Sequence, residues 1–146
     1  MLINLSEFNP DKVEYVIIGT GPASISLAFE LEKKNISCLL LEAGSFEYSD
    51  ESQEYYEGKL VGKNYLGDID VTRSRLFGGT SQKWGGMCRP FDESDFNNWP
   101  IDKNDLDSYQ KKAQKFLNLE NDFLPDKKIN QNINLINFNW STPTLR

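Results

Sequence analysis

The chain has 146 residues, which is enough for one ordinary domain and too few for two. Apolar residues make up 38%, and the net charge of −6 argues against nucleic acid or an anionic membrane surface as partner. The sequence has no run approaching the roughly 18 apolar residues of a membrane span, no visible secretory signal and no metal-ligand spacing of its two cysteines. A reduced, cytoplasmic protein is therefore expected. Because there is no histidine, no mechanism that needs imidazole can be run by these residues alone.

The first part of the chain predicts a strand, a helix and a second strand in succession. A polar lead-in covers residues 1–12, and the apolar run over 13–18 predicts a buried strand. Helical spacing of apolar residues predicts a helix over 22–34. A second apolar run over 37–42 predicts another strand, and its nearly uniform hydrophobicity is typical of a parallel strand covered on both faces. This order indicates an α/β fold.

The turn between the first strand and the helix has the composition of a phosphate-binding turn. Gly19 permits a tight turn, and Gly21 leaves no side chain between the backbone and a pyrophosphate. Pro22 suits the first helical position, where the free N–H groups and positive end of the dipole face this turn. Glu42 follows Gly19 by 23 positions, close to the roughly 20 expected of a ribose-binding carboxylate. Ser24 replaces the usual third glycine, so a plain structural turn is the alternative. The strand before the turn, the helix after it and the second strand with its terminal acid together favour a dinucleotide site for an unphosphorylated ribose.

The rest of the chain is less regular. Residues 44–70 are acidic and aromatic without a sustained period, and one short helix is expected near 51–56. The glycine-rich block over 73–86 would let the backbone approach a large planar or phosphorylated ligand, although a glycine-rich surface loop is the alternative. A helix is expected over 102–119, and a strand over 133–138 in the tail.

Four segments between about residues 13 and 119 point to a known family when they are taken together and in order. They are Val16–Ala23, Leu41–Gly44, Arg75–Ser81 with Trp84–Gly86, and Trp99–Ile101. In this combination the chain resembles the N-terminal part of the glucose–methanol–choline (GMC) flavoprotein oxidoreductases. The resemblance implies an incomplete Rossmann-type FAD-binding domain, the N-terminal portion of a doubly wound parallel sheet, with FAD as the dinucleotide.

The resemblance also implies a division of the chain and a set of cofactor contacts. Residues 13–120 would be the N-terminal part of the FAD-binding domain, and 121–146 a tail leading toward a missing substrate-binding portion. Within that domain the turn containing Gly19 and Gly21 would line the pyrophosphate, and Glu42 would hold the ribose. The loop over Gly78–Ser81 would pass along the flavin. The expected cofactor-binding residues are Gly19, Gly21, Pro22, Ala23, Glu42, Ala43, Arg75, Gly78, Gly79, Thr80, Ser81, Trp84 and Gly85.

Three departures from the family pattern qualify this expectation. Lys83 occupies the position at which some members attach FAD through a histidine, so non-covalent FAD is expected. Many members carry asparagine where Trp84 stands, and a tryptophan at this place resembles the pyranose-oxidase branch. Trp84 is expected either to pack on the flavin edge or to be a buried core residue. The resemblance implies that the family's catalytic histidine and substrate-binding domain would belong to sequence beyond Arg146. The chain thus looks like a truncated member, a fragment or one piece of a split enzyme, with a complementary C-terminal portion as partner.

Three functions are compatible with these motifs. The first is an FAD-dependent oxidoreductase that acts on the CH–OH group of a small alcohol or sugar by hydride transfer to flavin, represented here by its FAD-binding portion. The second is a dinucleotide-binding module or degenerate relative without turnover, which the absence of histidine favours; no catalytic residue and no metal ligand are assigned in this chain. The third is a nicotinamide-dependent dehydrogenase, against which the block over 75–86 argues, because an ordinary NAD domain has no need for it.

Overall fold

A computed structural model describes residues 3–59, 61–62 and 67–141. The chain divides into two compact units, Met1–Trp84 and Gly85–Arg146. This division follows compactness alone, and the expected domain boundaries at residues 12 and 120 stay predictions.

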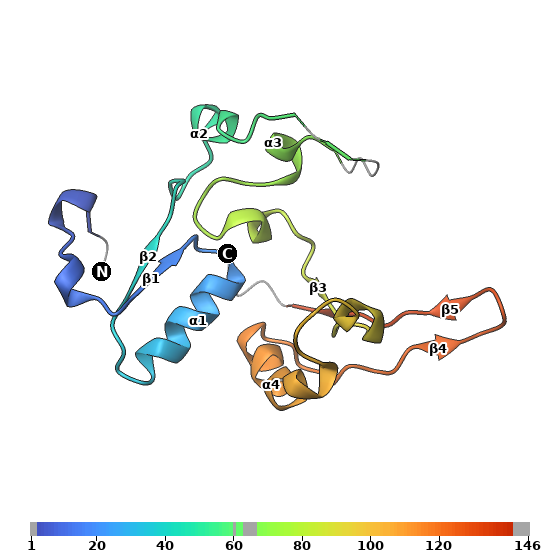
Figure 1. The fold of residues 1–146 in the computed structure, drawn as a ribbon. Coiled ribbons are helices and arrows are strands. Elements are labelled where there is room, and N and C mark those ends of the chain that lie inside the picture. Colours follow the sequence, from blue (N-terminus) through green and yellow to red (C-terminus); the bar gives the residue numbers. More distant parts are fainter. Residues whose placement is uncertain (1–2, 60, 63–66, 142–146) are drawn as a thin grey trace. The chain divides into compact units, whose positions relative to one another are not determined.

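The first unit is built around a parallel strand pair and the helix that connects its strands. Strand β1 (Tyr15–Ile18) pairs with β2 (Cys38–Leu41), with Tyr15 opposite Cys38. Helix α1 (Pro22–Glu32) lies between them in the sequence and packs on both strands (Figure 1). The predicted α/β character and parallel pairing are therefore confirmed, and each of the three elements lies within its predicted range.

Helix α1 ends two residues before its predicted end. Lys33 is the C-cap, and Asn35 adopts a positive φ of 56° that reverses the chain. The backbone N–H of Ile36 then donates to the carbonyl of Leu31 at 3.0 Å. Asparagine tolerates this left-handed conformation better than most residues, so the helix stops where such a residue becomes available.

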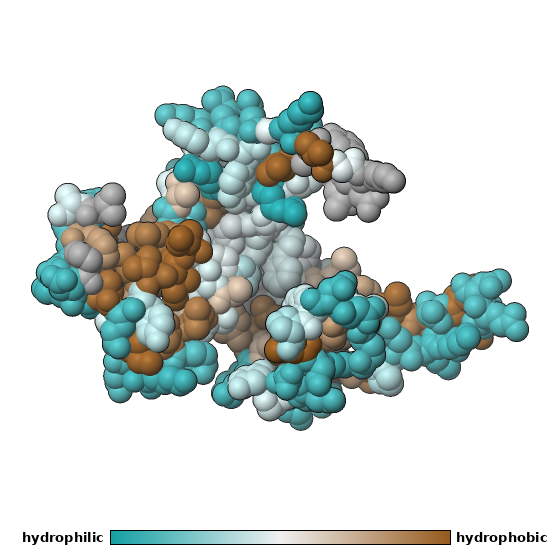
Figure 2. All heavy atoms as spheres, viewed as in Figure 1, coloured by the Kyte–Doolittle hydropathy of each residue, from teal (hydrophilic) through white to brown (hydrophobic). Residues whose placement is uncertain are grey.

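The apolar strands are less covered than their sequence suggests. In the described part of the first unit, Ile17 is the one buried apolar residue, whereas Ile18 is 85% exposed. Figure 2 shows apolar side chains in brown gathered at the surface of this strand pair. Further exposed apolar residues of β1, α1 and β2 are Tyr15, Val16, Leu27, Phe29 and Leu41. The expectation that the second strand is covered on both faces is wrong for the described structure, in which no residue of β2 is buried and α1 is the helix that packs on the strand pair.

Short elements complete the first unit. The lead-in contains two single 3-10 turns, Leu5–Glu7 and Pro10–Lys12. Helix α2 (Asp50–Glu54) confirms the short helix expected near 51–56, and Ser49 caps it by accepting from the N–H of Ser52 at 3.1 Å. Helix α3 (Ile69–Thr72) and a 3-10 turn over Gly79–Gln82 were not expected.

In the described part of the second unit there is one α-helix, α4 (Lys103–Phe116), where a helix was predicted over 102–119. Asp102 caps it, because its carboxylate accepts from the N–H groups of Asn104 at 2.8 Å and Asp105 at 3.3 Å. Asp105 reaches back to the N–H of Asp102 at 3.0 Å and completes a capping box. The helix start is thus determined by local sequence.

Two short antiparallel pairs accompany α4. Strand β3 (Met87–Cys88) pairs with β6 (Asn139–Trp140), and β4 (Lys127–Lys128) pairs with β5 (Asn134–Leu135). The strand predicted over 133–138 is therefore reduced to the two residues of β5. A 3-10 turn over Glu93–Phe96 precedes α4.

Candidate functional site

The first glycine turn leaves open space beside the start of α1. Gly19 adopts a φ of +90°, which favours glycine, and its N–H donates to the carbonyl of Leu41 at 2.7 Å. Gly21 is the N-cap of α1, with an ordinary φ of −66° and no side-chain cap. A Cβ placed on Gly21 would meet no described atom within 4 Å. The backbone therefore does not require glycine at this position, and its missing side chain leaves room beside the first turn of α1, where Pro22 and Ala23 lie.

Glu42 lies directly beside this turn. One carboxylate oxygen accepts from the backbone N–H of Thr20 at 3.0 Å and from the hydroxyl of Thr20, and the other accepts from the N–H of Gly44 at 2.9 Å. Two carboxylate oxygens offer about four acceptor positions, so these three bonds leave capacity for one more donor. The predicted proximity of the acid to the glycine turn is present, and the acid also links the ends of β1 and β2.

The second glycine block passes the same place. The N–H of Phe77 donates to the carbonyl of Ser45 at 2.8 Å, and the N–H of Gly78 donates to the Thr20 hydroxyl at 2.9 Å. A Cβ on Gly44 would stand 2.2 Å from the carbonyl oxygen of Arg75, so the two segments touch through their backbones. The structure thus brings the glycine turn, the acid and the second block into one cluster.

The hydroxyl groups of the second block hold the block itself together. Thr80 accepts from the backbone N–H of Ser74 at 3.2 Å, and Ser81 donates to the carbonyl of Gly78 at 2.6 Å. Gly78 and Gly79 have φ values of +87° and +60°, so both occupy the left-handed region. These bonds stabilise a tight loop whose form depends on its glycines.

A small cavity opens beside the end of β2. Its volume is about 320 Å³, and the Arg75 guanidinium lies at its wall. Arg75 Nη1 donates to the hydroxyl of Ser52 at 2.7 Å, and its Cζ lies 4.6 Å from the ring centroid of Tyr55. The remaining lining residues follow β2 or belong to the region of α2: Ala43, Gly44, Ser45, Ser49 and Glu51. A guanidinium held in this way can pair with a phosphate or stack on a planar ring.

The residue that holds the backbone of Arg75 in position was not predicted from the sequence. Gln53 is 6% exposed, and its side-chain amide donates to the carbonyl oxygens of Asp70 and Arg73, the latter at 2.5 Å. Its side-chain oxygen accepts from the N–H of Arg75 at 3.1 Å. One glutamine thereby satisfies three backbone groups of the chain that leads into the glycine block. A glutamine in a short acidic helix carries no local signal of such a role.

Two residues of the predicted set, Trp84 and Gly85, lie near the end of the block, next to Lys83. Trp84 is the last residue of the first unit and is 41% exposed, so its interpretation as a buried core residue is wrong. Gly85 belongs to the second unit. Lys83 places its Nζ 5.8 Å from the ring centroid of Tyr48.

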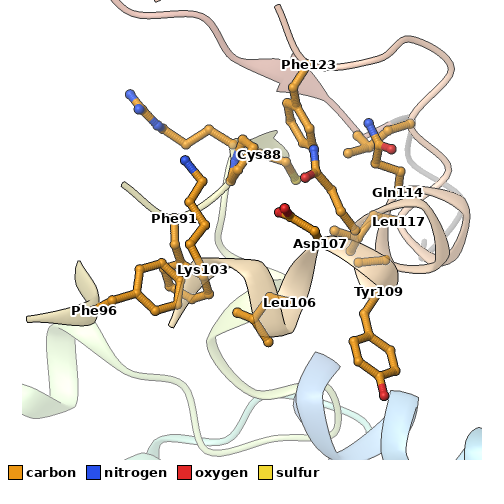
Figure 3. Close-up of a pocket in the computed structure, with 15 residues that line it drawn as sticks. Cys88, Phe91, Phe96, Lys103, Leu106, Asp107, Tyr109, Gln114, Leu117 and Phe123 are labelled. Atoms are coloured by element: carbon orange, nitrogen blue, oxygen red, sulfur yellow. The ribbon is translucent and has the colours of Figure 1, made fainter. Parts of the chain in front are cut away.

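A second cavity, of about 260 Å³, lies within the second unit (Figure 3). Its walls are mainly apolar side chains of α4 and the segments around it, with Phe91, Leu106 and Phe123 among them. The thiol of Cys88 also lines it, and burial raises the pKa of this thiol. A raised pKa keeps the thiol protonated, so it suits a structural role better than a nucleophilic one.

Comparisons with protein-family models, with curated proteins and with solved structures found no match for this chain. Within the described residues, no group of three or more His, Cys, Asp or Glu side chains is arranged to hold a metal ion. None of the described helices has the length and apolar character that crossing a membrane would take.

Proposed function

We propose that the first unit binds the ADP half of FAD, as part of an FAD-dependent oxidoreductase that resembles the GMC family. The observation that carries this proposal is the hydrogen-bonded cluster of Glu42, Thr20 and Gly78. It joins three motifs that were each assigned to the same ligand from the sequence, although up to 58 positions separate them. A purely structural turn would not need the acid and the second glycine block to meet at the open N-terminus of a helix.

The residues present fit the cofactor in three respects. The uncapped first turn of α1 and the open space beside Gly21 suit a pyrophosphate. The spare acceptor capacity of Glu42 suits a ribose hydroxyl, and a 2′-phosphate would be repelled by its charge. The cavity beside Arg75 suits the planar base or a phosphate oxygen.

The chemistry that flavin supplies when bound is acceptance of a hydride from an alcohol carbon, and a small alcohol or sugar is the proposed substrate. A base must also take the hydroxyl proton of that substrate. Because this chain has no histidine, its own residues bind and orient the cofactor in this proposal, and we assign no catalytic residue among them. A complementary portion of sequence would provide the base.

The same absence of histidine supports one alternative, a dinucleotide-binding module without turnover. Dye reduction with FAD and a panel of alcohols and sugars distinguishes the two, with and without the complementary portion of a longer relative. Turnover that depends on that portion supports the oxidoreductase, whereas tight FAD binding without turnover in either case supports the module. Robust turnover by residues 1–146 alone would contradict both.

Titration calorimetry tests the binding site itself. The full chain is titrated with FAD, ADP, NAD and NADP, and FAD and ADP are expected to bind while NADP binds more weakly than NAD. Glu42→Ala should reduce ADP affinity, whereas the exposed Glu57→Ala is the matched control and should not. After acid precipitation of the FAD complex, the yellow colour should remain in solution. No binding of any adenine nucleotide would refute the proposal, and yellow protein in the pellet would refute non-covalent attachment.

A further inference from the structure

The Thr20 side chain occupies an unusual position for a residue between two glycines. It is 2% exposed, although it is polar and lies in a turn. Its hydroxyl is in contact with Glu42 on one side and with the backbone of Gly78 on the other. The sequence motifs assign no role to this residue, because the pattern Gly-x-Gly leaves the middle position unspecified.

The hydrogen-bond partners determine which way the hydroxyl proton points. The backbone N–H of Gly78 can only donate, so the Thr20 oxygen must accept from it at 2.9 Å. The ionised carboxylate of Glu42 can only accept, so the Thr20 hydroxyl must donate to it. The backbone N–H of Thr20 donates to the same carboxylate oxygen at 3.0 Å. The Thr20 hydroxyl is thus the middle link of a hydrogen-bond chain that runs from the N–H of Gly78 to the carboxylate of Glu42.

From this arrangement we infer that Thr20 is a positioning residue of the dinucleotide site, an inference that rests on the proposed function. It orients the Glu42 carboxylate toward the ribose and holds the Gly78 loop where the flavin half of the ligand would pass. It touches both elements without needing to touch the ligand. Loss of the hydroxyl therefore affects the ADP half through Glu42 and the flavin half through Gly78.

This inference makes a prediction that distinguishes the two ligands. In the proposed site ADP requires Glu42, the first turn of α1 and the cavity beside Arg75, whereas FAD also requires the Gly78 loop. Thr20→Val keeps the shape of the side chain but leaves the buried N–H of Gly78 and one position on Glu42 without a partner. ADP affinity should fall about fivefold to tenfold, and FAD affinity should fall by about a further threefold to tenfold.

The experiment compares the full chain with Thr20→Val and Thr20→Ser by calorimetry with ADP and with FAD. Thr20→Ser retains the hydroxyl and should bind both ligands within about twofold of the unsubstituted chain. Thr72→Val is the matched control, because the Thr72 hydroxyl donates at 2.9 Å to the carbonyl of Asp68, the N-cap of α3; this variant should bind both ligands normally. Circular dichroism checks that each variant is folded, and Thr20→Ala serves as the hydroxyl-free variant if Thr20→Val does not fold.

Each outcome bears on the inference. Recovery by serine together with a larger loss for FAD than for ADP supports it. Equal losses for Thr20→Val and Thr20→Ser, or equal losses of ADP and FAD, would overturn it. If the unsubstituted chain binds neither ligand, the proposed function fails. The hydrogen-bond chain is then judged separately by hydrogen exchange at the Gly78 amide, which should be faster in Thr20→Val than in Thr20→Ser.

Discussion

Replacement of Glu42 is expected to weaken the fold as well as the proposed binding. Its carboxylate is the common acceptor for two donors of Thr20 and one donor of Gly44. Thr20 is 2% exposed, so water cannot readily replace the lost acceptor there, whereas Gly44 is only half-buried. A buried donor without a partner costs about 1–3 kcal/mol. For Glu42→Ala we therefore expect a loss of about 2–4 kcal/mol in the free energy of unfolding.

A milder substitution at the same position tests the geometry more closely. In Glu42→Gln one oxygen becomes an NH₂ group, which can only donate. Either the Thr20 donors or the Gly44 N–H must then face another donor, whichever way the amide is turned. The free energy of unfolding should fall by about 1–2 kcal/mol, less than in Glu42→Ala.

Urea denaturation followed by far-UV circular dichroism measures both losses, with Glu57→Ala as the matched control on an exposed acid. The free energy of unfolding should depend on urea concentration with the same slope in all variants, so that a change in the unfolding midpoint reports a change in stability. Losses below about 0.5 kcal/mol for both variants would mean that Glu42 does not link β1 and β2 in solution. Loss of ADP binding without loss of stability would mean that the acid acts on the ligand alone.

Three further predictions concern other contacts. Gly44→Ala should lower the free energy of unfolding of the first unit by about 3 kcal/mol in urea denaturation, because the new Cβ would stand 2.2 Å from the carbonyl oxygen of Arg75. Gly85→Ala is the control, because a Cβ there would meet no described atom within 4 Å, and it should leave the free energy of unfolding unchanged. Gln53→Leu should cost about 2–4 kcal/mol and accelerate hydrogen exchange at the Arg75 amide, and unchanged exchange would contradict its role. The rate of alkylation of Cys88 by iodoacetamide should rise at a higher pH than the rate for a cysteine in an unstructured peptide, because burial raises the pKa of the Cys88 thiol. Coincident pH profiles of the two rates would refute this prediction.

The sequence predicted those parts of the fold whose determinants are local. The apolar runs around β1 and β2 and the glycine turn at Gly19 indicated the strand–helix–strand unit, and the structure contains it. The start of α4 was predictable for the same reason, since Asp102 caps it and a cap acts within three residues of itself.

The parts that could not be predicted depend on partners far along the chain. Gln53 bonds to backbone groups 17 to 22 positions away, and Thr20 to a group 58 positions away. Nothing beside either residue reveals these contacts. The strand pairs β3–β6 and β4–β5 have two residues per strand, which is too short for an alternating pattern to be visible.

The contact between Thr20 and Gly78 also constrains the order in which the first unit folds. Pairing of β1 with β2 closes a loop of 23 residues from Tyr15 to Cys38, whereas the Thr20 contact closes one of 58. The longer closure costs about 0.8 kcal/mol more in chain entropy, so the strand pair has the advantage as the earlier event. The glycine block would then dock onto strands already in register. Loss of the Thr20 hydroxyl should in that case accelerate unfolding and leave the folding rate nearly unchanged.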